Sequence, residues 1–292
     1  MKVLITGATG QLGSDLVKHL KDKKETVYGY SQLQLDITNQ IEVRRVVHEI
    51  QPDVIIHTAA YTQVDQAEKF VEQAYQVNAY GSRNLVIEAE KIKSKFCYIS
   101  TDYVFDGNSN KPYREYDATN PLSIYGKSKL AGEVIVQSLS TSYFIIRTSW
   151  LYGFYGNNFV KTMLRKAKQG EPIKVVNDQY GSPTYSVDLS KFIYELIKTE
   201  KYGLYHASNS GQCSWYQLAK TIFDKVGITI NIEAISTSND LRDAIRPKYS
   251  VLDHLSIRCN EMDELPEWED ALNRFLVELG EITPPGPNAS ID

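Results

Sequence analysis

The chain of 292 residues has 42% hydrophobic and 23% charged residues, which is the composition of an ordinary globular protein. Its 32 Lys and Arg are interspersed with 36 Asp and Glu, so it lacks the clustered basic charge of a nucleic-acid-binding protein. No apolar run reaches about 18 residues, and we therefore expect no membrane span.

The three cysteines, Cys97, Cys213 and Cys259, are far apart in the chain. An odd number of dispersed cysteines favours a reduced protein of the cytoplasm over a disulfide-bonded secreted one. Neither the cysteines nor the five histidines have the spacing of metal ligands, so we predict no metal site.

Short β-rich segments alternate with helical stretches through the first 150 residues. The predicted strands are 2–6, 26–31, 53–58, 95–100 and 143–148. Their nearly continuous apolar character is typical of strands covered on both faces. The alternation predicts an α/β fold with a doubly wound, parallel Rossmann sheet over residues 1–150.

After residue 150 the chain becomes richer in loops of Gly, Asn, Ser and Pro. We predict helices at 186–199, 214–226 and 266–280 and a short strand at 228–235. Residues 151–280 would form a smaller, mainly substrate-binding part, and later segments that return to the sheet stay open. The tail 281–292 has little apolar content, and we predict that it is disordered.

Three glycines, Gly7, Gly10 and Gly13, follow the first predicted strand and open the next helix. In such a loop one glycine allows the tight turn, one admits a pyrophosphate, and one allows close helix–strand packing. The helix N-terminus offers N–H groups and partial positive charge to phosphate. Glycine-rich turns are common, but the strand–loop–helix context favours a dinucleotide site over a structural turn.

The end of the second predicted strand, "YGYSQ", contains neither an acidic residue nor an arginine. An acidic residue there would select NAD by binding the ribose hydroxyls and repelling a 2′-phosphate. Ser31 and Gln32 can bond a phosphate without neutralising it. We expect NADPH as the cofactor, and use of NADH stays open.

A tyrosine and a lysine four residues apart occur three times in the chain. The pairs are Tyr125/Lys129, Tyr194/Lys198 and Tyr216/Lys220. This spacing places both side chains on one helical face, so spacing alone does not distinguish the pairs. Only the first pair opens a helix after a strand that ends in hydroxyl residues.

A ketone that accepts a hydride must also gain a proton, which a positioned side chain can supply. Tyrosine has an ordinary pKa of about 10, and a nearby ammonium group lowers it. Thr101 ends the fourth predicted strand, at the carboxyl side where doubly wound sheets bind ligands. We therefore predict that Thr101, Tyr125 and Lys129 catalyse carbonyl reduction; the alternative is that Thr101 only caps the strand.

The glycine spacing resembles the extended, nucleotide-sugar branch of the short-chain dehydrogenase/reductase superfamily. "LDIT" (35–38), "HTAAYTQVD" (57–65) and "VNAYGSRNL" (77–85) are similar to further motifs of that branch. The resemblance implies that Asp36 contacts adenine and that Asn78 holds the 57–65 loop. The implied cofactor-binding residues are Gly7, Gly10, Gln11, Leu12, Gly13, Ser31, Asp36, Ile37, Ala59, Ala60, Tyr61, Asn78, Tyr125 and Lys129.

"TDYVFDG" (101–107) and "NPLSIYGKSKLAGE" (120–133) resemble the dTDP-4-dehydrorhamnose reductase family, and the similarity extends over almost all of residues 1–280. It implies reduction of the 4-keto group of dTDP-4-dehydro-β-L-rhamnose to dTDP-L-rhamnose for polysaccharide biosynthesis. The implied substrate-binding residues are Val64, Thr101, Asp102, Tyr103, Trp150, Asn157, Asn158 and Arg246. Of these, Val64, Tyr103 and Trp150 would line the sugar pocket, with the Trp150 indole stacked on the sugar, and Asn157, Asn158 and Arg246 would reach the nucleotide diphosphate. For Trp150, a core tryptophan is the alternative interpretation.

Two other functions stay open at this point. One is another nucleotide-sugar 4-ketoreductase or an epimerase, which would keep NAD tightly bound. The other is a non-catalytic regulatory subunit that senses a dinucleotide, although the complete Thr101, Tyr125 and Lys129 set argues against it. Some members of the resembled family form dimers through a metal held by surface carboxylates. We locate no such cluster, and we expect a monomer or a homodimer.

Overall fold

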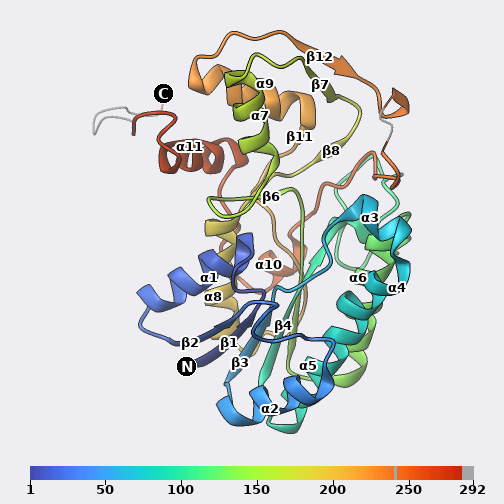
Figure 1. Cartoon of the computed structure of the whole chain (residues 1–292), viewed down its shortest axis with the longest axis vertical. Coiled ribbons are helices and arrows are strands. Elements are labelled where there is room, and N and C mark those ends of the chain that lie inside the picture. Colours follow the sequence, from blue (N-terminus) through green and yellow to red (C-terminus); the bar gives the residue numbers. More distant parts are fainter. Residues whose placement is uncertain (240–241, 285–292) are drawn as a thin grey trace.

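The computed structural model describes residues 1–239 and 242–284, and most of the tail predicted to be disordered lies outside them (Figure 1). Six parallel strands form the central sheet in the order β10-β5-β4-β3-β1-β2. They are β1 (Lys2–Thr6), β2 (Thr26–Tyr30), β3 (Val54–His57), β4 (Lys95–Thr101), β5 (Tyr143–Thr148) and β10 (Gly203–His206). The five strands predicted from the sequence are all present, so the doubly wound parallel fold is confirmed.

Helices cover both faces of this sheet (Figure 1). One layer contains α1 (Gln11–Asp22) and α8 (Ser186–Ile197), and the other contains α2 (Gln40–Ile50), α5 (Ser82–Lys91) and α6 (Ile124–Leu139). Because successive strand residues face opposite sides, Val3 and Ile5 pack against the layer of α1 and α8, and Leu4 packs against the layer of α2, α5 and α6.

Shorter helices connect β3 to the second layer and β4 to α6. They are α3 (Val64–Lys69), α4 (Val71–Tyr75), the π-helix η1 (Gln76–Gly81) and the 3-10 helix η2 (Asp102–Val104). The order of the strands reverses between β1 and β3, because β2 lies on one side of β1 and β3 on the other. Ligands of doubly wound sheets bind at the carboxyl ends of the strands around such a reversal.

The chain after residue 150 builds a second core beside the carboxyl ends of the sheet (Figure 1). Its helices are α7 (Phe159–Lys168), α9 (Trp215–Val226), α11 (Trp268–Glu278) and the 3-10 helix η3 (Thr237–Asn239). Helix α10 (Leu255–Cys259) packs instead against β10 and the core of the main sheet. Its strands are β6 (Leu151–Tyr152), β7 (Ile173–Val176), β8 (Tyr180–Gly181), β9 (Thr184–Tyr185), β11 (Cys213–Ser214) and β12 (Ile232–Ile235). The predicted strand 228–235 is shorter than expected, because only β12 pairs with β7.

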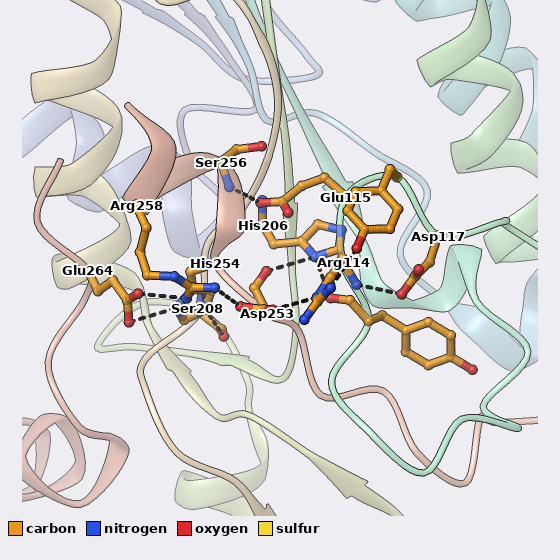
Figure 2. Close-up of polar contacts among 12 residues, drawn as sticks. Arg114, Glu115, Asp117, His206, Ser208, Asp253, His254, Ser256, Arg258 and Glu264 are labelled. Atoms are coloured by element: carbon orange, nitrogen blue, oxygen red, sulfur yellow. Dashed lines mark hydrogen bonds and ion pairs between the residues drawn. The ribbon is translucent and has the colours of Figure 1, made fainter. Parts of the chain in front are cut away.

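Strand β10 and helix α8 come from this later part of the chain but complete the main sheet. A polar cluster holds the edge strand β10 to the segments beside it (Figure 2). Glu115 Oε1 accepts hydrogen bonds from the backbone N–H groups of His206 and Ser256, at 3.1 and 3.0 Å. Nearby, Arg258 forms ion pairs with Asp253 and with Glu264. Residues 253–264 are thereby fixed against the sheet.

Among the residues that the structure describes, no helix has the length and apolar character needed to cross a membrane.

Candidate active site

The glycine loop lies between α1 and the loop that follows β3. Gly7 has φ +69°, and a Cβ there would lie 2.7 Å from the backbone nitrogen of Ala59. A Cβ on Gly13 would lie 2.2 Å from the carbonyl oxygen of Gly7. Only glycine therefore fits at both positions. Within the described chain no side chain caps α1, which leaves its N-terminus available to a phosphate.

A cavity of about 820 Å³ opens at the carboxyl ends of β1, β3, β4 and β5, which is within the range of small-molecule sites. Predicted cofactor residues that line it are Gly7, Gly10, Gln11, Leu12, Gly13, Asp36, Ile37, Ala59, Ala60 and Tyr61. Predicted catalytic and substrate residues that line it are Val64, Thr101, Asp102, Tyr103, Tyr125, Lys129, Trp150 and Asn157. The structure thus brings together residues from distant parts of the sequence.

Tyr125 is held by the first turn of α6. Ser123 caps this turn by accepting a hydrogen bond from Gly126 N at 3.2 Å. A Cβ on Gly126 would lie 2.2 Å from the carbonyl oxygen of Tyr103, so the helix packs directly on η2. The Tyr125 and Tyr103 rings meet edge to face, with centroids 5.5 Å apart. Burial raises the pKa of Tyr125, and the neighbouring Thr101 side chain opposes that increase.

Lys129 lies one turn further along α6 and is buried. Its Nζ donates a hydrogen bond to the carbonyl oxygen of Ile99 at 2.6 Å and lies 4.0 Å from the centroid of the Tyr98 ring. Burial lowers the pKa of Lys129 to about 7, although the charge of Glu133 opposes this effect. The ammonium group is therefore close to losing its proton at neutral pH.

Thr101 stands where β4 ends and η2 begins. Its Oγ1 accepts a hydrogen bond from Tyr103 N at 3.2 Å and donates one to Asp102 Oδ1 at 3.1 Å. Burial raises the pKa of Asp102 to about 6. Thr148, at the end of the adjacent β5, also lines the cavity. Its Oγ1 is buried and has no hydrogen-bond partner among the described residues, as expected of a group that awaits a ligand.

Trp150 lies at the start of the chain segment that follows β5, and it lines the cavity. Its backbone has φ +46°, a conformation that bulky residues rarely adopt. The indole stacks on Trp215 with ring centroids 3.5 Å apart and planes 9° apart. A Cβ on Gly181 would lie 2.5 Å from Trp150 Cε2. The indole that we predicted to stack on a sugar is therefore fixed between elements of the second core.

Four predicted binding residues are not part of the cavity lining. Asn78 supports the lining instead, since its Oδ1 accepts from Tyr61 N at 2.8 Å and its Nδ2 donates to Tyr61 O at 3.2 Å. Asn158 donates to Gln11 Oε1 at 3.0 Å and, as the N-cap of α7, accepts from Lys161 N at 3.1 Å. Both amides are thus engaged within the protein.

The other two of these residues are Ser31 and Arg246. Ser31 donates to Gln34 Oε1 through its backbone N and its Oγ, at 3.0 and 2.9 Å. Arg246 binds both carboxylate oxygens of Asp65, with Nη1 and Nη2 at 3.0 and 2.7 Å. Asp36 does line the cavity, and its Oδ1 accepts from Thr38 N and Thr38 Oγ1, so part of its role is to shape the local turn.

Sequence reasoning missed several lining residues. Thr58 follows β3, and Thr148 and Ser149 follow the apolar part of β5. The signal that identified Thr101, a hydroxyl at the carboxyl end of a buried strand, would have found them. Gln73 and Val77 reach the cavity from α4 and η1, and no local pattern marks them. Among the described residues, no group of three or more His, Cys, Asp and Glu could hold a metal ion.

Comparisons with known proteins agree with this geometry. The family model described as RmlD substrate binding domain matches residues 1–281. A dTDP-4-dehydrorhamnose reductase of Aggregatibacter actinomycetemcomitans is 42% identical, over 94% of this chain and 98% of that protein. Spore coat polysaccharide biosynthesis protein SpsK of Bacillus subtilis is also 42% identical, over 95% and 97%.

A crystal structure of dTDP-4-dehydrorhamnose reductase from Bacillus anthracis in complex with NADP is 49% identical to this chain. It superposes with a TM-score of 0.93 and covers 95% of this chain and 99% of that one. The chain therefore belongs to the dTDP-4-dehydrorhamnose reductase family.

Proposed function

We propose that this protein uses NADPH to reduce the 4-keto group of dTDP-4-dehydro-β-L-rhamnose, giving dTDP-L-rhamnose for polysaccharide biosynthesis. The observation that carries the proposal is the meeting of Thr101, Tyr125 and Lys129 beside a glycine loop in one cavity. The names of the relatives, a reductase of this sugar and a spore coat polysaccharide protein, support the same substrate and pathway.

The residues of the cavity fit a dinucleotide. The glycine loop and the N-terminus of α1 would hold the pyrophosphate. A Cβ at Gly7 or Gly13 would clash with the backbone of Ala59 or of Gly7, so the tight turn that brings this N-terminus to the cavity requires glycine. Asp36 and Ile37 would contact adenine, and Ala59, Ala60 and Tyr61 would lie along the cofactor. Ser31, at the end of β2, faces no acidic neighbour in "YGYSQ" that would repel a 2′-phosphate. When bound, NADPH supplies the hydride.

The chain itself supplies the proton. Tyr125 is protonated in this environment, because burial raises its pKa, and it would donate the phenolic proton to the ketone oxygen. The positive charge of Lys129 would stabilise the negative charge left on Tyr125. Thr101 would hold the carbonyl oxygen by a hydrogen bond. In the family, the lysine also grips the nicotinamide ribose, and we extend that role to Lys129.

The sugar would lie among Val64, Tyr103 and Trp150, with Asp102 as a polar contact, and Asn157 would reach the nucleotide diphosphate. The unpartnered hydroxyl of Thr148 is a further candidate for a polar contact with the sugar. An indole face suits a pyranose ring, and Trp150 already presents one face to Trp215.

Two residues predicted to reach the nucleotide diphosphate are engaged elsewhere. Arg246 would bind the diphosphate only by exchanging its contact with Asp65. Asn158 would act indirectly, by holding Gln11 of the glycine loop.

We propose that residues 1–150 carry the cofactor site, that residues 151–280 mainly bind the sugar nucleotide, and that β10 and α8 complete the first part. A cytoplasmic location fits the three cysteines, which are all unpaired. We expect a monomer or a homodimer.

The test is to mix purified protein with dTDP-4-dehydro-β-L-rhamnose and follow NADPH absorbance while the product is identified by NMR. We expect NADPH loss equal to the dTDP-L-rhamnose formed. A parallel reaction contains dTDP-4-keto-6-deoxy-D-glucose, and turnover of that ketone alone would refute the proposed sugar. Tightly bound NAD without NADPH consumption would indicate an epimerase, and inertness towards both sugars would indicate a regulatory subunit.

A further inference from the structure

Glu133 is a buried carboxylate one helical turn beyond Lys129 on α6. Its Oε1 accepts hydrogen bonds from Ser100 Oγ on β4 and from Arg147 Nε on β5, the latter at 2.9 Å. Its Oε2 accepts from Arg147 Nη2 at 2.7 Å. One carboxylate therefore ties the helix that carries Tyr125 and Lys129 to two central strands of the sheet.

These bonds converge on the backbone that positions the proposed catalytic groups. Ser100 stands between Ile99, whose carbonyl oxygen accepts the hydrogen bond from Lys129 Nζ, and Thr101. A shift of β4 relative to α6 would therefore change the bond between Lys129 and Ile99 and would move Thr101 relative to Tyr125. The negative charge of Glu133 also favours the ammonium form of Lys129, as the charge of a nearby carboxylate must.

Arg147 also contacts His206 on the neighbouring strand β10. Its Nη1 lies 3.3 Å from His206 Nε2, and His206 Nδ1 lies 3.0 Å from the carbonyl oxygen of Tyr113. Since a carbonyl oxygen only accepts, Nδ1 carries the proton. Burial lowers the pKa of His206, so the ring is neutral and Nε2 accepts from Arg147. Figure 2 shows His206 in the polar cluster that fixes residues 253–264 to the sheet.

We propose that Glu133 is a positioning residue of the reduction: its carboxylate holds Lys129 in register with Thr101 and favours the positively charged form of the lysine. The proposal rests on the roles proposed above for Lys129 and Thr101. Two other titratable groups lie close to Lys129: Tyr98 on β4 and His57 on β3, and burial keeps both neutral. Tyr125 lies one turn before Lys129 on the same helix.

Glu88 provides a matched control. Glu133 and Glu88 are each 1% exposed. Glu88 lies on α5 and pairs with His48 and Lys91, at 2.9 and 2.7 Å. None of these three residues lines the cavity. A Glu88→Gln substitution removes a buried charge without touching Lys129 or its acceptor.

The experiment measures NADPH affinity against pH by fluorescence titration, together with kcat against pH, for the parent, Glu133→Gln, Glu133→Asp and Glu88→Gln. In the parent, affinity should fall as pH rises through the pKa of Lys129, because the ammonium group loses its charge. In Glu133→Gln the midpoint should move to lower pH by about one unit or more, since the opposite charge is gone. Glu133→Asp should bring the midpoint most of the way back to the parental pH, and Glu88→Gln should leave the midpoint at the parental pH.

An unmoved midpoint in folded Glu133→Gln, an equal shift in Glu88→Gln, or no alkaline limb in the parent would each overturn the proposal. Should Glu133→Gln fail to fold, Ser100→Ala removes one bond to the carboxylate and keeps its charge. That variant should lower kcat severalfold while the NADPH midpoint stays in place, and an unchanged kcat would overturn the positioning role. The NADPH titration needs no sugar, so a protein inert towards the sugar would refute the proposed function alone.

Discussion

Replacing Tyr125 with phenylalanine tests the proton transfer most directly. The change removes one oxygen atom and keeps the ring, which packs edge to face on Tyr103 at 5.5 Å. Neither the Ser123 cap nor the contact of Gly126 with η2 involves the phenol. The first turn of α6 should therefore keep its place, and the effect of the substitution should be confined to chemistry.

The expected loss follows from the role of the phenol as general acid. Such groups contribute about 10²–10⁴-fold to rate, which is about 2.7–5.4 kcal/mol of transition-state stabilisation. A hydrogen bond from the hydroxyl would add only about 0.5–1.5 kcal/mol to binding. We expect kcat to fall by at least about 10²-fold while the Kd for NADPH changes by less than about tenfold.

Single-turnover reduction of dTDP-4-dehydro-β-L-rhamnose, followed by NADPH absorbance, separates the chemical step from product release. Tyr194→Phe is the matched control, because Tyr194 on α8 and Lys198, which caps the end of that helix, have the same spacing. The hydroxyl of Tyr194 donates to Glu25 at 3.1 Å, away from the cavity lining, so this variant should retain parental turnover.

Parental turnover in Tyr125→Phe would remove the phenol from the mechanism. An equal loss in both variants would show that the assay reports on folding, and the argument for Tyr125 would then fail. A large rise in the Kd for NADPH with little change in kcat would instead make the residue part of the cofactor site only.

Three further substitutions test the remaining parts of the site. Lys129→Ala should raise the KM for NADPH and lower kcat together, whereas Lys127→Ala, exposed on the same helix, should change neither in steady-state kinetics. Gly13→Ala would place a methyl group 2.2 Å from a backbone oxygen, so isothermal titration should show at least tenfold weaker NADPH binding, and parental affinity would contradict the cradle. Trp215→Leu removes the partner that stacks on Trp150 at 3.5 Å; the KM for the sugar should rise severalfold while the KM for NADPH stays constant.

The main sheet was largely predictable from local patterns. Its first five strands are continuous apolar segments separated by helices, and the structure contains all of them. Strand β10 was missed because "GLYH" is short, half-exposed at its start and begins with a glycine at φ +142°. It becomes a strand only by pairing with β5, which no local periodicity reveals.

Local sequence patterns also predicted one part of the candidate site and missed another. Residues that follow a strand or open a helix, such as Thr101 and Tyr125, are marked by position along the chain, and they do line one cavity. Contacts between elements that are distant in the sequence have no such local signal. The stacking of Trp150 on Trp215 and the ion pair of Glu133 with Arg147 depend on how helices and strands pack, which sequence patterns leave undetermined.

The carboxylate of Glu115 also has a consequence for solubility. Strand β10 borders the sheet, and such a border offers unpaired backbone groups to a second chain. The N–H of Ala207 bonds inward to Arg147 O, whereas the N–H of His206 points outward and is occupied by Glu115. An intruding strand would have to displace a negative charge held in place by a second N–H group. This arrangement discourages self-association along the border and would protect the folded protein against aggregation at high concentration.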